Sequence, residues 1–335
     1  MRALKYALRA TLICFGLTQV HTVYAQPQQK IDAFVDKMVS QHQFDAEFVR
    51  QTLAKANINQ AILEAIARPW EAKPWYQYYP IFLTEKRLAK GVEFWRKHAE
   101  TLKKAQQETG VPAQIITAII GVETFYGTYK GKYSVLDALY TLGFYYPPRA
   151  TFFASELEQY FLLTREEGFA MDEVQGSYAG AMGWGQFISS SYRHYAIDFD
   201  GDGVRDLLNN PTDAIGSVAN YFKKHGWKNN QAVAYPVSVD KNNAAITPLI
   251  RRDLKYMDTW QDLLDADVAL AADITIDPKQ SVKLLEFELQ EDAEYWVGLP
   301  NFYVITRYNH SPLYAMAVFQ FSEQLKQAME QVEEQ

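Results

Sequence analysis

Val111-Pro-Ala-Gln-Ile-Ile-Thr-Ala-Ile-Ile-Gly-Val-Glu-Thr-Phe-Tyr-Gly127 is the stretch that decides the fold. Pro112 suits a first helical turn, and the apolar residues that follow predict a helix at the centre of the core. Glu123 falls on this apolar surface, one turn after Ile119 and Ile120. Burying a lone carboxylate is costly unless it is paired or protonated. Two interpretations therefore stay open: a structural ion pair with an arginine, or an acid kept protonated by desolvation.

The composition indicates a globular protein with a large core. The chain has 335 residues, of which 48% are hydrophobic, and this length suits about two domains. The formal net charge is −7, and an acidic protein is a poor general binder of nucleic acid or anionic membranes. The histidines form no H-x-x-x-H pair, so the sequence does not support a zinc site.

Residues 1–25 are typical of an export signal that is removed after Ala25. A short apolar run follows the basic residues Arg2, Lys5 and Arg9, and neither this run nor any later stretch is long enough to span a membrane. Cys14 lies inside the run, where its neighbours fit a lipid-attachment signal poorly. We therefore expect an exported, periplasmic protein without disulfides, and lipid anchoring is the less favoured alternative.

Hydrophobic periodicity predicts an α+β protein that is mainly helical. Residues 26–70 are expected to be helical, and further helices are expected over 84–109, 111–127, 134–142, 151–167, 213–227 and 312–332. Thr151 is expected to cap the helix over 151–167. Strands are expected over 282–289, 295–297 and 302–307.

Residues 70–80 are rich in aromatic side chains, namely Trp70, Trp75, Tyr76, Tyr78 and Tyr79. Such rings can anchor an extended segment to the core or form a platform for sugar rings. Core anchoring is favoured, because aromatic side chains most often fill protein interiors.

Gly176-Ser-Tyr-Ala-Gly-Ala-Met-Gly-Trp-Gly-Gln-Phe187 does not read as an ordinary helix or strand. Glycine lets the backbone approach a ligand closely, and Ser177 and Gln186 could donate hydrogen bonds to a substrate lying along it. A tight structural loop is the alternative. The spacing is not G-x-S-x-G, so the segment predicts no nucleophile elbow.

Asp198-Phe-Asp-Gly-Asp-Gly-Val-Arg-Asp206 matches the first half of an EF-hand calcium loop. Its expected ligands are Asp198, Asp200, Asp202 and the Val204 carbonyl, but Asn209 stands where an EF-hand has its glutamate. Either Asp206 or Asp213 completes the set. A single loop favours structural calcium over calcium sensing, and solvated charge is the remaining alternative.

Several segments in one order resemble the B-type soluble lytic murein transglycosylases, which have a lysozyme-like core. They are Gly121-Val-Glu-Thr-x-x-Gly127, Tyr145-Tyr-Pro-x-Arg149-Ala, the glycine-rich stretch, the Asp198 stretch, Asp213-Ala-Ile-Gly-Ser-Val-Ala-Asn-Tyr-Phe222, Arg307-Tyr-Asn-x-Ser311 and Leu313-Tyr-Ala-Met316. The resemblance implies an N-terminal helical region (26–75), a core with the calcium loop (76–230), a small β-containing domain (231–306) and a final core segment (307–335).

The resemblance also implies the site. Glu123 falls at the position of the family's catalytic acid and base. The positions that match the sugar-binding groove are Tyr78, Arg149, Ser177, Gln186, Tyr308, Asn309 and Tyr314. The Asp198 loop matches the family's calcium loop, but one extra residue lies between Asp202 and Asp213.

The implied reaction cleaves the β-1,4 bond between N-acetylmuramic acid and N-acetylglucosamine in peptidoglycan strands and leaves 1,6-anhydro ends. Glu123 would act first as acid and then as base, in a monomeric enzyme. A muramidase-type hydrolase and a non-catalytic peptidoglycan-binding protein are the alternatives.

Overall fold

The computed structural model describes residues 19–68, 73–251, 253–271 and 274–333. Residues 1–18 of the expected export signal, and Trp70 of the aromatic segment, lie outside these ranges. The described chain is mainly helical and contains antiparallel sheets, so the α+β prediction is confirmed. Within these ranges, no helix combines the length and apolar content that a membrane span requires.

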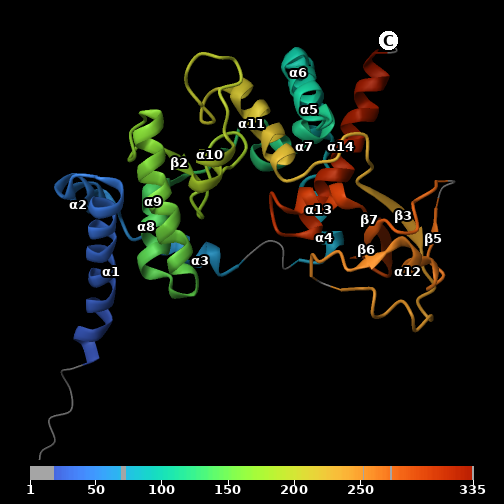
Figure 1. The fold of residues 1–335 in the computed structure, drawn as a ribbon, viewed down its shortest axis with the longest axis horizontal. Helices are drawn as coiled ribbons and strands as arrows, with labels where there is room; N and C mark the ends of the chain where they lie inside the picture. Colours follow the sequence, from blue (N-terminus) through green and yellow to red (C-terminus); the bar gives the residue numbers. More distant parts are fainter. Residues whose placement is uncertain (1–18, 69–72, 252, 272–273, 334–335) are drawn as a thin grey trace, which may run out of the picture.

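One end of the molecule is helical, and the larger sheet lies at the other end (Figure 1). The helical end contains α1 (Gln19–His42), α2 (Ala46–Lys55), α3 (Gln60–Ile66), α8 (Val135–Tyr145) and α9 (Ala150–Glu167). Side-chain caps begin α2 and α3 at Asp45 and Asn59. Glu158 of α9 joins α1 to the other helices, because it binds Lys37 at 2.5 Å and His42 at 2.7 Å.

The centre of the molecule is α7 (Ala113–Thr124), in which nearly every side chain is buried. Helix α7 packs against α5 (Glu85–Lys97), α6 (Ala99–Thr109), α11 (Pro211–Lys224) and α14 (Pro312–Glu333). Gly110, with φ of 74°, ends α6 in the left-handed conformation and turns the chain into α7. The predicted central core helix is therefore confirmed.

The larger sheet has five antiparallel strands in the order β4-β6-β7-β3-β5. They are β3 (Ala234–Ser238), β4 (Asp258–Thr259), β5 (Ala269–Leu270), β6 (Ser281–Glu288) and β7 (Ala293–Gly298). Leu285 and Phe287 of β6 face the main core, whereas Val282 and Leu284 join a second apolar cluster. The alternation of side chains along β6 thus gives the sheet one apolar cluster on each face.

Residues 73–84, here called the strap, run from the sheet to the start of α5. The strap contains α4 (Trp75–Tyr78) and a 3₁₀ turn, η2 (Tyr79–Ile81). Trp75 and Tyr78 are each only 2% exposed. The Trp75 ring packs on Phe287, and its Nε1 donates to Glu294 Oε1 at 2.8 Å. The favoured prediction of aromatic core anchors is confirmed for these two residues.

Shorter elements complete the fold. A two-stranded sheet pairs β1 (Tyr133–Ser134) with β2 (Gln175–Gly176) immediately before the glycine-rich loop. The other short elements are η3 (Pro147–Arg149), α10 (Ser189–Tyr195), α12 (Trp260–Leu264) and α13 (Pro300–Thr306).

Two local predictions are wrong. Residues 302–307, expected as a strand, lie mostly in α13, because Pro300 begins a helix that buries Phe302 and Ile305 on one face. Tertiary packing has overridden β-propensity there. Thr151 does not cap α9: the turn at η3 runs directly into the helix, so α9 begins at Ala150.

Several predicted boundaries also change. The helical region expected over 26–70 contains α1, α2 and α3, and the helix expected over 84–109 is divided at His98 into α5 and α6. The helix expected to reach Gly127 ends at Thr124. The aromatic segment is not an extended loop throughout, since it contains α4 and η2.

Glu156 of α9 provides a pH-dependent test of the helical packing. It is 4% exposed and accepts a 2.9 Å hydrogen bond from the Ser190 backbone N–H at the start of α10. Burial raises the pKa of Glu156 above its ordinary value, partly offset by hydrogen bonds from Ser190. A carboxyl whose pKa is raised by folding favours the folded state when protonated, and this contribution is lost as the pH rises through the folded-state pKa.

We therefore expect Glu156→Gln, which keeps the acceptor and cannot ionise, to raise the free energy of unfolding at pH 7.5. The gain should disappear near pH 4. Urea denaturation at both pH values measures the difference, with exposed Glu100→Gln as the control. An equal effect of Glu156→Gln at both pH values would contradict the assignment.

Candidate active site

Glu123 lies in the last turn of α7, where the helix ends in consecutive left-handed residues. Phe125, Tyr126 and Gly127 have φ values of 51°, 56° and 77°. The Phe125 and Tyr126 N–H groups donate to the carbonyls of Gly121 and Ile120, at 3.0 and 3.4 Å. These bonds satisfy carbonyls that a helix end would otherwise leave without partners. Glu123 is half-buried, so its carboxyl group stands at the end of a rigid core helix.

Tyr314, in the first turn of α14, donates its hydroxyl to Glu123 Oε1 at 2.5 Å. Tyr308, just after α13, donates its hydroxyl to the Gly185 carbonyl at 2.6 Å. Burial, and next the charge of Glu123, raise the pKa values of both Tyr308 and Tyr314 well above the ordinary value. Both phenols therefore stay protonated at neutral pH, and Tyr314 remains a hydrogen-bond donor to the acid.

Tyr78 of the strap reaches the same cluster. Its ring is buried against Phe82, with ring centres 5.1 Å apart. Its phenol also contributes to the raised pKa of Tyr314, after burial and the charges of Glu123 and Tyr308. The structure thus brings together Glu123, Tyr314, Tyr308 and Tyr78 from different elements.

The glycine-rich loop (residues 176–187) is hydrogen-bonded to Thr124, the residue that follows Glu123 in the chain. Thr124 Oγ1 donates to the Trp184 carbonyl at 2.9 Å and accepts from the Gly127 N–H at 3.0 Å. Trp184 covers Gly127 so closely that a Cβ there would meet the indole ring at 2.6 Å. One threonine therefore aligns the loop with the end of α7.

Ser177 and Gln186 are both half-buried in the loop, where they also bind its backbone. Ser177 Oγ accepts the N–H groups of Ala179 and Ala181, at 3.2 and 3.1 Å. Gln186 Nε2 donates to the carbonyls of Lys130 and Gly183, at 3.1 and 3.0 Å. The side chains predicted to face a substrate thus help to shape the tight structural loop that was the alternative interpretation.

Arg149 and Asn309 are less closely tied to this cluster. Arg149 is exposed at the end of η3, and its guanidinium lies over the rings of Phe152 and Phe153. Asn309 is half-buried beside Tyr308, and its carbonyl accepts the Ser311 N–H at 2.7 Å.

The Asp loop (residues 198–206) brings three of the predicted metal ligands together. Oxygens of Asp198, Asp200 and Asp202 lie within 4.8 Å of one another. Backbone N–H groups of Gly201, Asp202 and Gly203 fold onto the Asp198 carboxylate, and its pKa is lowered first by the Gly203 bond. Convergent carboxylate oxygens are the donors that calcium prefers, so these residues fit the ion.

The other expected ligands make hydrogen bonds within the loop or at its ends. Asp213 is fully buried, and its two oxygens accept the N–H groups of Phe199 and Asp206 at 2.8 and 2.9 Å. Asp206 Oδ1 accepts from Leu208 and Asn209. The Val204 N–H donates to Asp202 Oδ1 at 2.8 Å. Asp213 therefore holds the two ends of the loop together.

Sequence reasoning missed the residues that support the acid. Thr124 and Tyr126 lie inside the quoted motif, but nothing local shows that Thr124 reaches the glycine-rich loop. Tyr126 packs so closely on Gly91 and Gly121 that a Cβ at either would lie within 2.5 Å of its hydroxyl oxygen. The presence of glycine at both positions is the sequence signal that could have indicated this close packing of Tyr126.

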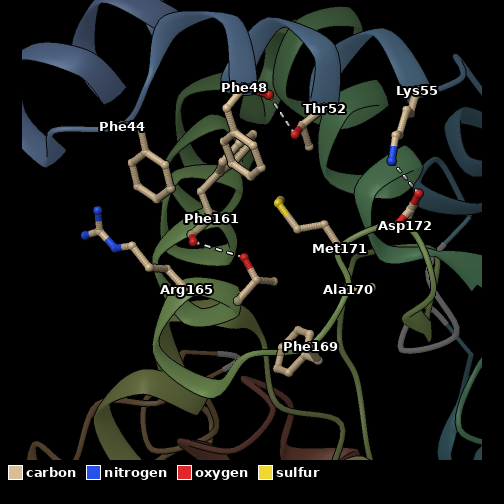
Figure 2. Close-up of a pocket in the computed structure, with 11 residues that line it drawn as sticks. Phe44, Phe48, Thr52, Lys55, Phe161, Arg165, Phe169, Ala170, Met171 and Asp172 are labelled. Atoms are coloured by element: carbon tan, nitrogen blue, oxygen red, sulfur yellow. Dashed lines mark hydrogen bonds and ion pairs between the residues drawn. The ribbon is translucent and has the colours of Figure 1, made fainter.

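A cavity of about 480 Å³ between α2 and α9 contains none of the predicted site residues (Figure 2). Its walls include four phenylalanines, Phe44, Phe48, Phe161 and Phe169, and the Lys55–Asp172 ion pair lies at one edge. The candidate active site is therefore identified by Glu123 and its partners and not by this cavity.

Comparison with known proteins agrees with this geometry. The family model described as "Transglycosylase SLT domain" matches residues 26–323. Membrane-bound lytic murein transglycosylase B of Escherichia coli (strain K12) is 42% identical over 300 residues, covering 87% of this chain and 81% of that protein.

Solved structures are similarly close. Soluble lytic transglycosylase SltB1 from Pseudomonas aeruginosa is 45% identical, with a TM-score of 0.84, over 90% of this chain and 99% of that one. The Escherichia coli lytic transglycosylase Slt35 in complex with calcium is 40% identical, with a TM-score of 0.81, over 89% and 93% of the two chains.

The fold and the site together define an enzyme of the lysozyme-like lytic transglycosylase class. The chain belongs to the Transglycosylase SLT domain family. The resemblance drawn from the ordered motifs, the lysozyme-like fold and the enzyme class are therefore confirmed.

The packing of Trp184 on Gly127 can be tested separately from the cost of the left-handed backbone. Gly127→Ala should destabilise the protein by about 1–2 kcal/mol through its positive φ and by about 1–3 kcal/mol more through the clash with Trp184. Gly168→Ala is the matched control, because Gly168 has the same φ of 77° and nothing within 4 Å of the added Cβ. Denaturant unfolding of both variants measures the difference, and equal losses would exclude a clash.

Proposed function

We propose that the enzyme cleaves the N-acetylmuramic acid–β-1,4–N-acetylglucosamine bond of peptidoglycan strands and forms 1,6-anhydromuramic acid ends. The observation that carries the proposal is the Glu123 carboxyl group held by Tyr314 between α7, α14 and the glycine-rich loop. The close relative named as a murein transglycosylase supports the choice of substrate.

In the first step, protonated Glu123 donates its proton to the glycosidic oxygen, and the bond between C1 and that oxygen breaks. The positive charge that develops at C1 is met by the substrate's own acetamido group. The hydroxyl of Tyr314 holds one oxygen of Glu123 and limits the rotation of the carboxyl group. A fixed acid near the leaving oxygen is what general acid catalysis requires.

In the second step, the same carboxylate takes the proton from the C6 hydroxyl of the muramic acid, whose oxygen attacks C1. This closes the 1,6-anhydro ring, returns the proton to Glu123 and consumes no water. Standard glycosidases use two carboxyl groups, whereas in this proposal Glu123 alone serves as the acid and then as the base.

The substrate groove is proposed to lie along the glycine-rich loop and the 308–314 segment. Ser177, Gln186, Tyr308, Asn309 and Tyr314 line it, and Tyr78 closes it from the strap. Arg149 contributes from the helical end. The exposed guanidinium of Arg149 and the half-buried Asn309 support contact with a polymer at the surface.

We expect Glu123→Gln to lower release of muropeptides from purified sacculi by roughly a hundredfold to ten-thousandfold, since a general acid typically contributes that factor. Binding to sacculi should persist, because the amide keeps the shape of the carboxyl group. Pull-down and chromatography measure the two properties. Retained turnover in Glu123→Gln would remove Glu123 from the mechanism.

Mass spectrometry of the wild-type products separates the reaction from its alternatives. Anhydro ends support the transglycosylase, and reducing ends would indicate a muramidase-type hydrolase instead. Binding without any release would indicate a non-catalytic peptidoglycan-binding protein.

The Asp loop is proposed to bind a structural calcium ion through Asp198, Asp200, Asp202 and the Val204 carbonyl, with Asp213 as the late carboxylate. The converging carboxylates support this ligand set, and a similar protein of known structure is a calcium complex. A bound cation would neutralise the clustered acids and hold the loop beside α10 and α11.

Calcium at a hundredfold excess over its Kd should raise the free energy of unfolding by about 2.7 kcal/mol, seen as a higher Tm than in EDTA. Asp198→Asn with Asp202→Asn should remove this difference. Calorimetry with magnesium at the same concentration is the control for ionic strength, and identical transitions with and without EDTA would count against the site.

We further propose a periplasmic monomer that is exported by residues 1–25 and has the regions 26–75, 76–230, 231–306 and 307–335. The basic start and short apolar run support export. The separate apolar cluster of the larger sheet supports the boundaries around 231–306.

A further inference from the structure

We propose that Arg87 is a positioning residue that fastens the end of α7, and thereby Glu123, to the strap. The inference rests on the proposed function, because it concerns the placement of the acid that the mechanism uses.

Arg87 lies in the first turn of α5, where its backbone N–H donates to the Thr84 hydroxyl oxygen at 3.2 Å. Its guanidinium binds backbone carbonyls on two separate segments. Nη1 donates to the carbonyls of Ile81 and Phe82 in the strap, at 2.6 and 2.7 Å. Nε donates to the carbonyl of Gly121 in α7, at 3.2 Å.

These carbonyls lie where two helical elements end. Ile81 and Phe82 end η2, and Gly121 lies in the last turn of α7, where a cation also interacts favourably with the helix dipole. The guanidinium lies 5.4 Å from the ring centre of Phe82 and 5.3 Å from that of Phe125. Several donors in one plane suit this arrangement, and a lysine ammonium could not reproduce it.

The two segments that Arg87 binds, the end of α7 and the strap, both bear on the position of Glu123. The Gly121 carbonyl also accepts the Phe125 N–H that helps to turn the chain directly after Glu123. Phe82 packs on the buried ring of Tyr78, with ring centres 5.1 Å apart, and the Tyr78 phenol contributes to the raised pKa of Tyr314, the donor to Glu123. Arg87 therefore connects the helix that carries the acid with the strap that carries Tyr78.

Arg87→Ala and Arg87→Met should lower kcat on purified sacculi by roughly tenfold to a hundredfold, because small displacements of a catalytic group carry costs of this order. KM should stay within about twofold, since substrate contacts are unchanged. Arg87→Lys should lie between these variants and the wild type. Arg96→Met, at an exposed position of the same helix, is the matched control and should keep wild-type rates.

Two further readouts separate positioning from general stability. Guanidinium chloride at millimolar, non-denaturing concentration should restore part of the kcat of Arg87→Ala, whereas ammonium chloride should not. Hydrogen exchange of the Phe125 and Tyr126 amides should be faster in Arg87→Ala than in wild type or Arg96→Met. This second readout does not depend on activity.

The proposal would be overturned if Arg87→Ala kept the kcat of the wild type and exchanged its Phe125 and Tyr126 amides at the wild-type rate. It would also be overturned by a loss of kcat that follows the loss of Tm and shows no rescue by guanidinium. Failure of the wild-type enzyme to release anhydro products would instead overturn the proposed function, while the exchange measurement would still decide the role of Arg87.

Discussion

The left-handed turn that ends α7 is the constraint on which the rest of the site depends. A buried helix must satisfy its last carbonyls within the protein, since water cannot reach them. The carbonyls of Ile120 and Gly121 receive the Tyr126 and Phe125 N–H groups, and Arg87 adds a second donor to Gly121. The turn places Glu123 at the edge of the core.

This turn carries a cost that surrounding contacts offset. Phe125 and Tyr126 adopt a conformation that costs about 1–2 kcal/mol for residues with a Cβ. The Tyr126 ring is buried beside Gly91 and Gly121, and its hydroxyl finds no hydrogen-bond partner among the described residues. Strain and a buried polar atom therefore accumulate beside the acid, as is typical of functional sites.

The larger sheet supports the site indirectly through the strap. Trp75 packs on Phe287 and binds Glu294, so the start of the strap depends on β6 and β7. The other end of the strap depends on Arg87. The sheet, although remote from Glu123 in sequence, thereby helps to fix the position of Tyr78 in the core.

The sequence by itself determined the class of fold, the central helix, the place of Glu123 in it and the order of the family's motifs. The first three follow from apolar periodicity and helical spacing, which are local properties of the chain, and the last follows from the resemblance to a known family. Only the tertiary structure decided that residues 302–306 are helical and that the side chain of Ser177 binds its own loop. Only the tertiary structure shows that Arg87 binds both the strap and α7. Helix ends and hydrogen-bond partners depend on groups distant in sequence, and only the folded chain brings those groups together.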